Sequence, residues 1–90
     1  MNITNVKIFK TSMKGPVLAY ANVILDSKII IRGIRLLQKD GRRFISMPSR
    51  RLINSNRKFR DVVNPLNREF RKELTDAIFE AYEEFLKLEE

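Results

Sequence analysis

The chain has 90 residues and a formal net charge of +7, and it contains no cysteine and no histidine, which excludes disulfide bonds, thiolate metal sites and histidine-based catalysis. Apolar residues make up 43% and charged residues 32% of the sequence, as in soluble globular proteins, and no apolar run approaches the roughly 20 residues of a membrane-spanning helix. We therefore expect one cytoplasmic domain over residues 1–90, with no metal, no other cofactor and no membrane insertion.

Hydrophobic patterns typical of strands occupy the first two thirds of the chain. Four strands are expected, at residues 6–9, 17–25, 28–38 and 44–47. Turn residues separate them, with Asp26-Ser27 predicting a tight hairpin and Asp40-Gly41 the next turn. Pro48 ends the last strand because proline cannot donate a hydrogen bond to a strand ladder.

The third strand is predicted to be apolar on both faces. If Leu25 pairs with Lys28 across the hairpin, Ile29 and Ile31 point away from the alanine-rich face of the second strand. One helix covers only one face of a sheet, so we expect a second subunit to contact Ile29 and Ile31. The alternative is that both are simply strand-favouring residues of a central strand. Gly33, in the middle of this strand, indicates a bulge or a close approach of another backbone segment rather than a binding site.

The C-terminal third predicts one helix, which Asn67 caps and which runs without Gly or Pro to Leu88. One apolar stripe is expected to pack on the sheet: Phe70, Leu74, Ala77, Ile78, Ala81, Phe85 and Leu88. A second stripe is interpreted as part of a dimer interface, the alternative being a wide core face covered by the N-terminal strand: Phe79, Tyr82 and Leu86. These elements predict an α+β fold, with a four- to five-stranded antiparallel sheet over about residues 1–63 and a long helix over about residues 66–88.

Positive charge is concentrated in the middle of the sequence. Residues 28–60 carry eleven Lys and Arg against one acid, whereas residues 61–90 carry four against nine acids. Such a layout is typical of a protein with one face toward a polyanion, although a basic surface that only aids solubility is the alternative. The expected nucleic-acid-binding residues lie in or beside a basic loop over residues 48–60: Ser49, Arg50, Arg51, Asn54, Arg57, Lys58 and Arg60. Guanidinium groups bind phosphate bidentately, and the neutral side chains can donate to phosphate and sugar.

Two motifs in this region are specific: Met47-Pro48-Ser49-Arg50-Arg51, and Phe59-Arg60-Asp61 followed by Asn64-Pro65-Leu66-Asn67. Together with weaker matches at residues 23–26 and 34–37, they resemble the stage V sporulation protein G family of bacterial septation regulators in both order and spacing. The resemblance covers about residues 3–82. The chain departs from the family pattern in two places: Asn64 stands where a histidine is common, and residues 53–58 form a polar, basic loop of its own.

The resemblance implies four or five antiparallel strands followed by a helix, assembled as a homodimer. It also implies a regulator that binds DNA, and in some members RNA, and that influences cell division, sporulation or gene expression. Within the family, the basic residues just after the Met-Pro-Ser turn are implicated in nucleic-acid contact, and here these are Arg50 and Arg51.

Two functions are therefore weighed. The first is a dimeric, non-enzymatic regulator that binds DNA or RNA through strands and loops, since no helix-turn-helix pattern is present. A preference for single strands is weakened because most phenylalanines sit at expected core positions. The second is a protein-interaction module of the division or regulatory machinery, with a protein partner on the second stripe of the helix or on the basic loop. An enzyme is not expected, because the acids lie mostly on one helix face.

Overall fold

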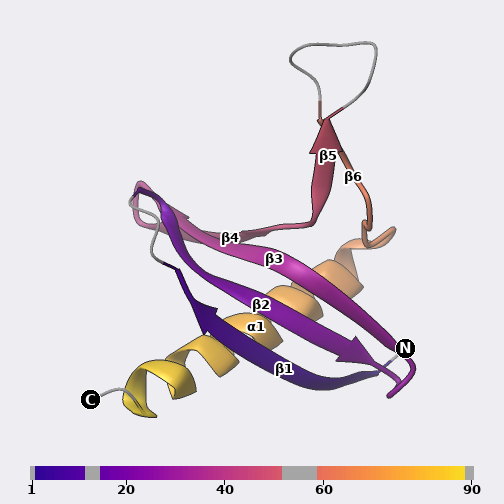
Figure 1. Cartoon of the computed structure of the whole chain (residues 1–90), viewed down its shortest axis with the longest axis horizontal. Helices are drawn as coiled ribbons and strands as arrows, with labels where there is room; N and C mark the ends of the chain where they lie inside the picture. Colours follow the sequence, from indigo (N-terminus) through magenta and orange to yellow (C-terminus); the bar gives the residue numbers. More distant parts are fainter. Residues whose placement is uncertain (1, 12–14, 52–58, 89–90) are drawn as a thin grey trace.

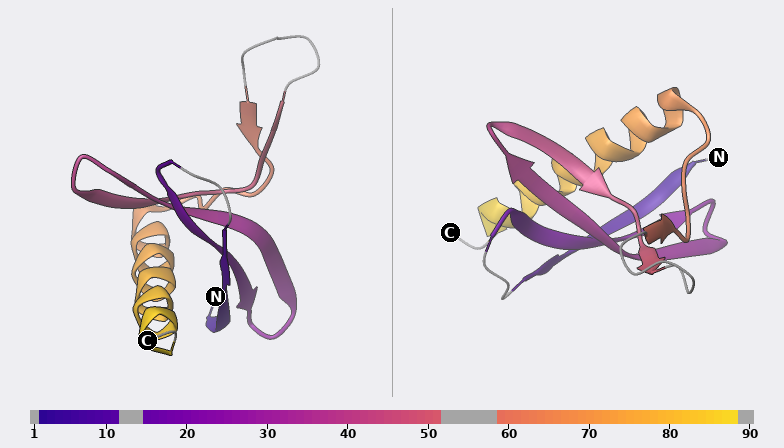
Figure 2. Two further views of the ribbon diagram at one scale, coloured as in Figure 1. Left: turned by 60° about the vertical axis from the view of Figure 1, so that its left-hand side comes forward. Right: turned by 90° about the horizontal axis from the view of Figure 1, so that it is seen from above.

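The structure, a computed structural model, describes residues 2–11, 15–51 and 59–88. Its elements follow in chain order: β1 (Ile3–Lys10), β2 (Val17–Leu25), β3 (Ile29–Lys39), β4 (Arg42–Ser46), β5 (Ser49–Arg51), β6 (Phe59–Asp61) and α1 (Arg68–Leu88). Strands β1 to β4 form an antiparallel sheet in sequential order, and β5 pairs with β6 in a separate two-stranded ribbon. The helix α1 lies along one face of the sheet and leaves the other face without a helix (Figures 1 and 2). The predicted α+β fold is confirmed.

The core lies between the sheet and α1. Strand β2 alternates between buried and partly buried residues, and its buried side chains face α1 together with residues from the flanking strands. Among the described residues, the largest almost completely buried side chains are Val23, Ile34, Leu36, Met47, Leu74 and Ile78. Because each large apolar side chain contributes about 1.5–3 kcal/mol when it is fully buried, this layer is the main source of stability that the structure shows.

The register between β2 and β3 differs by one residue from the prediction. Asp26 and Ser27 adopt positive φ angles of 51° and 53°, and the amide of Lys28 donates to the carbonyl of Leu25 at 2.9 Å. Lys28 therefore belongs to the turn, and Leu25 pairs with Ile29 instead. Because side chains alternate between the two faces, this shift of one residue exchanges the faces of the residues that follow.

A bulge at Gly33 then reverses the exchange. Gly33 has a φ of 81°, and the pairs Val23–Ile31 and Ala21–Ile34 enclose one extra residue in β3. The amide of Gly33 donates to Oδ1 of Asn22 at 3.2 Å, so a side chain supplies the acceptor there. The predicted bulge is confirmed.

The assignment of Ile31 to a dimer interface is therefore corrected. The shifted register turns Ile31 toward α1, and only 6% of its surface is exposed. Ile29 is 54% exposed at the start of β3, and its role in an interface stays a prediction. The same shift places Ile30, which pairs with Ile24, on the face without a helix.

The helix begins as predicted, because Oδ1 of Asn67 accepts a hydrogen bond from the amide of Phe70 at 2.7 Å. Its buried residues are Leu74, Ile78 and Tyr82. Tyr82 is thus corrected from a dimer residue to a core residue, and the wide core face is the better description of its position. Leu88, predicted to pack in the core, is 85% exposed at the end of the helix. No helix in the described part of the chain is long and apolar enough to cross a membrane.

Candidate nucleic-acid interface

The ribbon of β5 and β6 projects beyond the edge of the sheet at which β4 lies (Figure 1). Two features fix its base to the sheet. Met47, between β4 and β5, is buried with 1% of its surface exposed, and the carbonyl of the next residue, Pro48, accepts a hydrogen bond from the amide of Val62 at 2.7 Å. The ribbon is therefore held firmly where it leaves the core.

Arg50 and Arg60 are direct cross-strand partners on this ribbon. Residues that pair directly have Cβ atoms about 4.5–5.5 Å apart and side chains on the same face, and like charges in this position destabilise a hairpin. Both arginines are exposed, and the described residues offer neither of them an ion-pair partner. The ribbon thus carries two adjacent guanidinium groups on one face.

This arrangement suits a polyanion. An anionic oxygen between two guanidinium groups accepts charge-assisted hydrogen bonds and removes their mutual repulsion. A two-stranded ribbon also fits the major groove of B-DNA, which is about 12 Å wide. The geometry can therefore serve either backbone contact or base contact.

Of the remaining predicted binding residues, two lie in the ribbon and three lie outside the described residues. Ser49 is half-buried and pairs with Asp61, while Arg51 follows Arg50 at the next register position. Three residues lie outside the described part of the chain: Asn54, Arg57 and Lys58. Of the seven predicted residues, the ribbon brings together Ser49, Arg50, Arg51 and Arg60.

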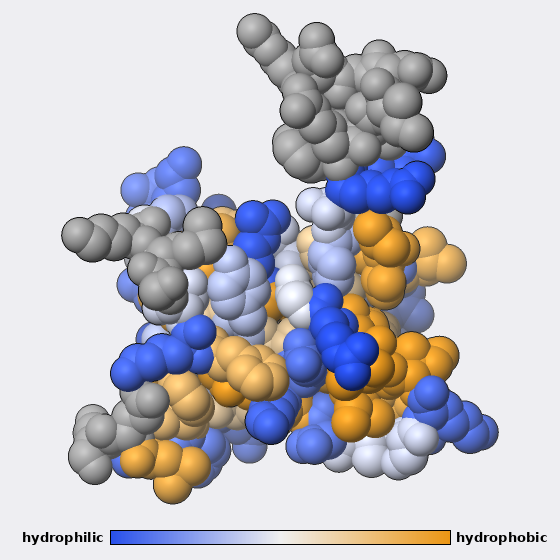
Figure 3. Space-filling view, in the orientation of Figure 1, coloured by the Kyte–Doolittle hydropathy of each residue, from blue (hydrophilic) through white to orange (hydrophobic). Residues whose placement is uncertain are grey.

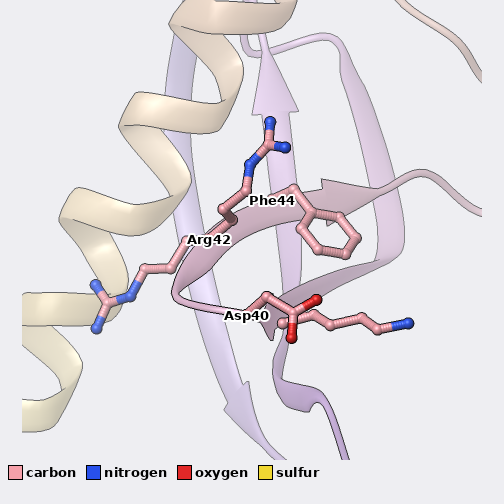
Figure 4. Close-up of a pocket in the computed structure, with 5 residues that line it drawn as sticks. Asp40, Arg42 and Phe44 are labelled. Atoms are coloured by element: carbon pink, nitrogen blue, oxygen red, sulfur yellow. The ribbon is translucent and has the colours of Figure 1, made fainter.

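A second pair of like charges escaped the sequence analysis. Lys39 and Arg42 are cross-strand partners at the end of the β3–β4 hairpin, beside an open hollow of about 370 Å³ (Figure 4). Five residues line this hollow: Lys39, Asp40, Arg42, Arg43 and Phe44. The signal in the sequence is the concentration of charge over residues 39–43, which was counted within the basic stretch of residues 28–60 but not predicted to form a separate pair.

Arg43 differs from its neighbours because it points to α1. Its Nη1 forms an ion pair with Oε1 of Glu83 at 2.5 Å, and its Cζ lies 5.8 Å from the ring centroids of both Phe79 and Tyr82. Its Nε also donates to Oε1 of Gln38 at 3.3 Å. Arg43 thus attaches the hairpin to the helix, whereas Arg42 has no ion-pair partner among the described residues.

The predicted dimer residues do not form one surface. Ile29 lies at the end of the sheet where β3 begins, whereas Leu86, 36% exposed, lies near the other end of the molecule, where α1 finishes (Figure 1). Phe79 is half-buried and packs edge-to-face on Tyr82, with ring centroids 6.4 Å apart. The interface assignment of Ile29, Phe79 and Leu86 stays a prediction.

Larger apolar exposure occurs in the segment between β6 and α1. Val62 is 63% exposed and Leu66 is 99% exposed. Leu66 belongs to the Asn64-Pro65-Leu66-Asn67 motif, but neither residue was predicted to bind a partner. Asn64, in the same segment, accepts a hydrogen bond from Nη1 of Arg71 at 3.3 Å and so links the segment to the helix. Among the described residues, no group of acids is placed to hold a metal ion.

Comparisons with known proteins agree with the motifs. The SpoVG family model matches residues 1–84. A protein from Archaeoglobus fulgidus is 38% identical over 82 residues, which cover 91% of this chain and 94% of the relative. A protein from Treponema denticola is 35% identical over 92% of this chain and 87% of its own length, and one from Alkaliphilus oremlandii is 33% identical over 100% and 95%. All three carry the name "Putative septation protein SpoVG". The chain belongs to the SpoVG family.

Proposed function

We propose that the protein is a dimeric, non-enzymatic regulator of the cytoplasm that binds DNA or RNA through the β5–β6 ribbon. A role in septation is proposed from the names of its relatives, and a role in sporulation from the resemblance of its motifs. The observation that carries the proposal is the direct pairing of Arg50 with Arg60 on a projecting ribbon. A pair that opposes folding of its own hairpin is best explained by a ligand that needs both charges.

Charge elsewhere in the sheet supports this proposal. None of the four strands β1 to β4 contains an aspartate or glutamate, whereas α1 contains six acids on its exposed side. The helix also carries four basic residues, so a polyanion is attracted mainly to the sheet and ribbon. A homodimer would present two ribbons, and the second would bind at the high effective concentration that the first creates.

The proposal is tested by fluorescence anisotropy with labelled duplex DNA, single-stranded DNA and RNA at several salt concentrations. If a dimer neutralises about six phosphates, affinity falls roughly a thousandfold between 50 and 200 mM salt. The double variant Arg50→Gln/Arg60→Gln should flatten this dependence. The matched control is Arg68→Gln/Lys72→Gln, which removes the same charge from exposed positions on α1 and should bind like the wild type.

A second candidate function, a protein-interaction module of the division or regulatory machinery, is favoured by the exposure of Val62 and Leu66. The two proposals differ in cells. If the Arg50→Gln/Arg60→Gln variant loses nucleic-acid binding but still complements a deletion, the protein-interaction proposal is supported. A wild-type protein whose binding to all three ligands is absent or independent of salt would refute the first proposal.

A further inference from the structure

The face of the sheet without a helix carries a row of residues that begins with the exposed Phe9 and the half-buried Tyr20. The register places Phe9 of β1 beside Tyr20 of β2, Tyr20 beside Arg35 of β3, and Arg35 beside Ser46 of β4. Nη2 of Arg35 donates to Oγ of Ser46 at 3.2 Å, which orients its guanidinium group. Phe9 is 39% exposed, although the sequence had suggested that phenylalanines belong mostly to the core.

A second row lies next to the first, toward the β3–β4 turn. Leu37 pairs with Phe44, and Lys39 pairs with Arg42. Because side chains alternate along a strand, all four share the face of Arg35 and Ser46. Phe44 is 42% exposed and lines the hollow beside Lys39 and Arg42. The volume of this hollow, about 370 Å³, is within the range of pockets that hold small ligands.

The electrostatic character of this face is uniform. Its strand positions include five basic residues and no acid: Lys7, Arg32, Arg35, Lys39 and Arg42. Nζ of Lys7 lies 5.4 Å from the ring centroid of Phe9. In Figure 3, which views this face, hydrophilic side chains are interspersed with hydrophobic ones on the left and in the centre, while the largest hydrophobic region lies on the right, below the ribbon.

We propose that this face binds unpaired nucleotides, so that Phe9, Tyr20 and Phe44 stack on the bases of a single strand. Arg35, Lys39 and Arg42 bind its phosphates. The inference rests on the proposed nucleic-acid function and adds a second binding surface, separate from the ribbon and selective for single strands. Stacking on aromatic side chains tolerates any base, because every base has a π-face.

Two other occupants fit this face less well. A duplex keeps its bases stacked inside, so it offers no base surface to Phe9 or Phe44. A second copy of the chain, related by two-fold symmetry, would place the same patch on both sides of the contact. The basic residues of one copy would then lie against those of the other, with no acid from the strands to neutralise them.

The test uses the full chain and fluorescein-labelled 12-nucleotide probes: oligo(dT), oligo(U) and a blunt DNA duplex of the same length. The variant Phe9→Leu/Phe44→Leu keeps apolar volume but removes stacking. We expect its affinity for both single strands to fall by about tenfold or more, because each stacked aromatic contributes roughly five- to one-hundredfold. Its affinity for the duplex should stay within about twofold of the wild type. Leu66→Ala, an exposed apolar site away from this face, is the matched control and should change neither affinity.

Ultraviolet crosslinking of the wild type to oligo(U), followed by peptide mass spectrometry, gives a second measurement that does not depend on a variant. Crosslinks on peptides containing Phe9 or Phe44 support the inference, and crosslinks confined to the ribbon overturn it. The inference also fails if Phe9→Leu/Phe44→Leu binds single strands normally while Arg50→Gln/Arg60→Gln loses them, although the proposed function then survives. Equal loss of duplex and single-strand binding overturns it too, as does a shift from dimer to monomer in sedimentation of the phenylalanine variant. No binding of any probe by the wild type ends both proposals.

Discussion

Arg43 of β4 and Glu83 of α1 form an ion pair that joins the edge of the sheet to the helix over 40 positions of sequence. Both side chains are roughly half exposed, so the pair itself contributes at most about 1 kcal/mol. The contact of the same guanidinium group with the rings of Phe79 and Tyr82 adds a comparable amount.

The first prediction is that Arg43→Ala destabilises the protein by about 1–2 kcal/mol. Its melting temperature should then fall by roughly 4–16 °C, given the usual shift for a domain of this size, measured by circular dichroism. Glu83→Gln should have a smaller effect. Arg42→Ala is the control, because Arg42 lies on the other face of β4, and a fall in its melting temperature equal to that of Arg43→Ala would contradict the assigned role of Arg43.

The second prediction concerns the opposed arginines of the ribbon. Arg60→Glu replaces a repulsive cross-strand pair with an attractive one opposite Arg50, which should stabilise the ribbon by about 0.2–1 kcal/mol. Hydrogen exchange at the amide of Val62, which closes the base of the ribbon, should slow accordingly. Nucleic-acid affinity should fall in the same variant. Faster exchange, or unchanged affinity, would show that the two arginines are not paired for a ligand.

The third prediction tests the bulge in β3. Apart from Gly33 itself and its two chain neighbours, no described residue has an atom within 4 Å of a Cβ placed on Gly33, so Gly33→Ala meets no steric obstacle among them. The positive φ of 81° should nevertheless make Gly33→Ala unfavourable by about 1–2 kcal/mol, measured by urea denaturation. Gly33→Asn should be milder, because asparagine tolerates positive φ better. Equal stability of the alanine variant and the wild type would mean that the bulge relaxes.

The fourth prediction concerns the start of α1. Asn67→Ala removes the acceptor for the amide of Phe70 and should lower the free energy of unfolding by about 1 kcal/mol. Asn67→Asp should retain most of the stability, because aspartate caps equally well. Urea denaturation of the three proteins measures this, and similar losses in both variants would indicate that the side-chain cap is not the cause.

Local patterns predicted the fold class, the cap at Asn67 and the bulge at Gly33. The predicted register between β2 and β3 was wrong because Asp26 and Ser27 adopt positive φ angles although neither is a glycine. Nothing in the sequence therefore indicated that Lys28 belongs to the turn. The extra residue of the bulge at Gly33 interrupts the alternation of side chains, so Ile31, Ile34 and Leu36 all lie on one face. A correct expectation of the bulge, carried through to the faces, would have moved Ile31 into the core.

The periodicity of hydrophobic residues could not predict contacts between segments that are far apart in the sequence. Whether Tyr82 is a core residue depends on β4, whose Arg43 covers it, and no local rule places that strand beside α1. The basic cluster was recognised from Arg50, Arg51 and Arg60, but their pairing across strands of three residues each was not. Such short strands have too few residues to show an alternating pattern.

Strands β1 to β4 carry basic residues and no acid, whereas α1 carries six acids against four basic residues, and this uneven distribution gives the molecule an electric dipole moment. Near a strongly negative polymer, this dipole rotates the protein before any contact forms, so that the sheet and ribbon face the polymer and the helix faces away from it. Encounters in the wrong orientation become rarer, and association should be fastest in dilute salt, where the field extends furthest. In a complex formed through the sheet and ribbon, as proposed above, the acidic side of α1 would face the solvent, where a positively charged molecule can approach it.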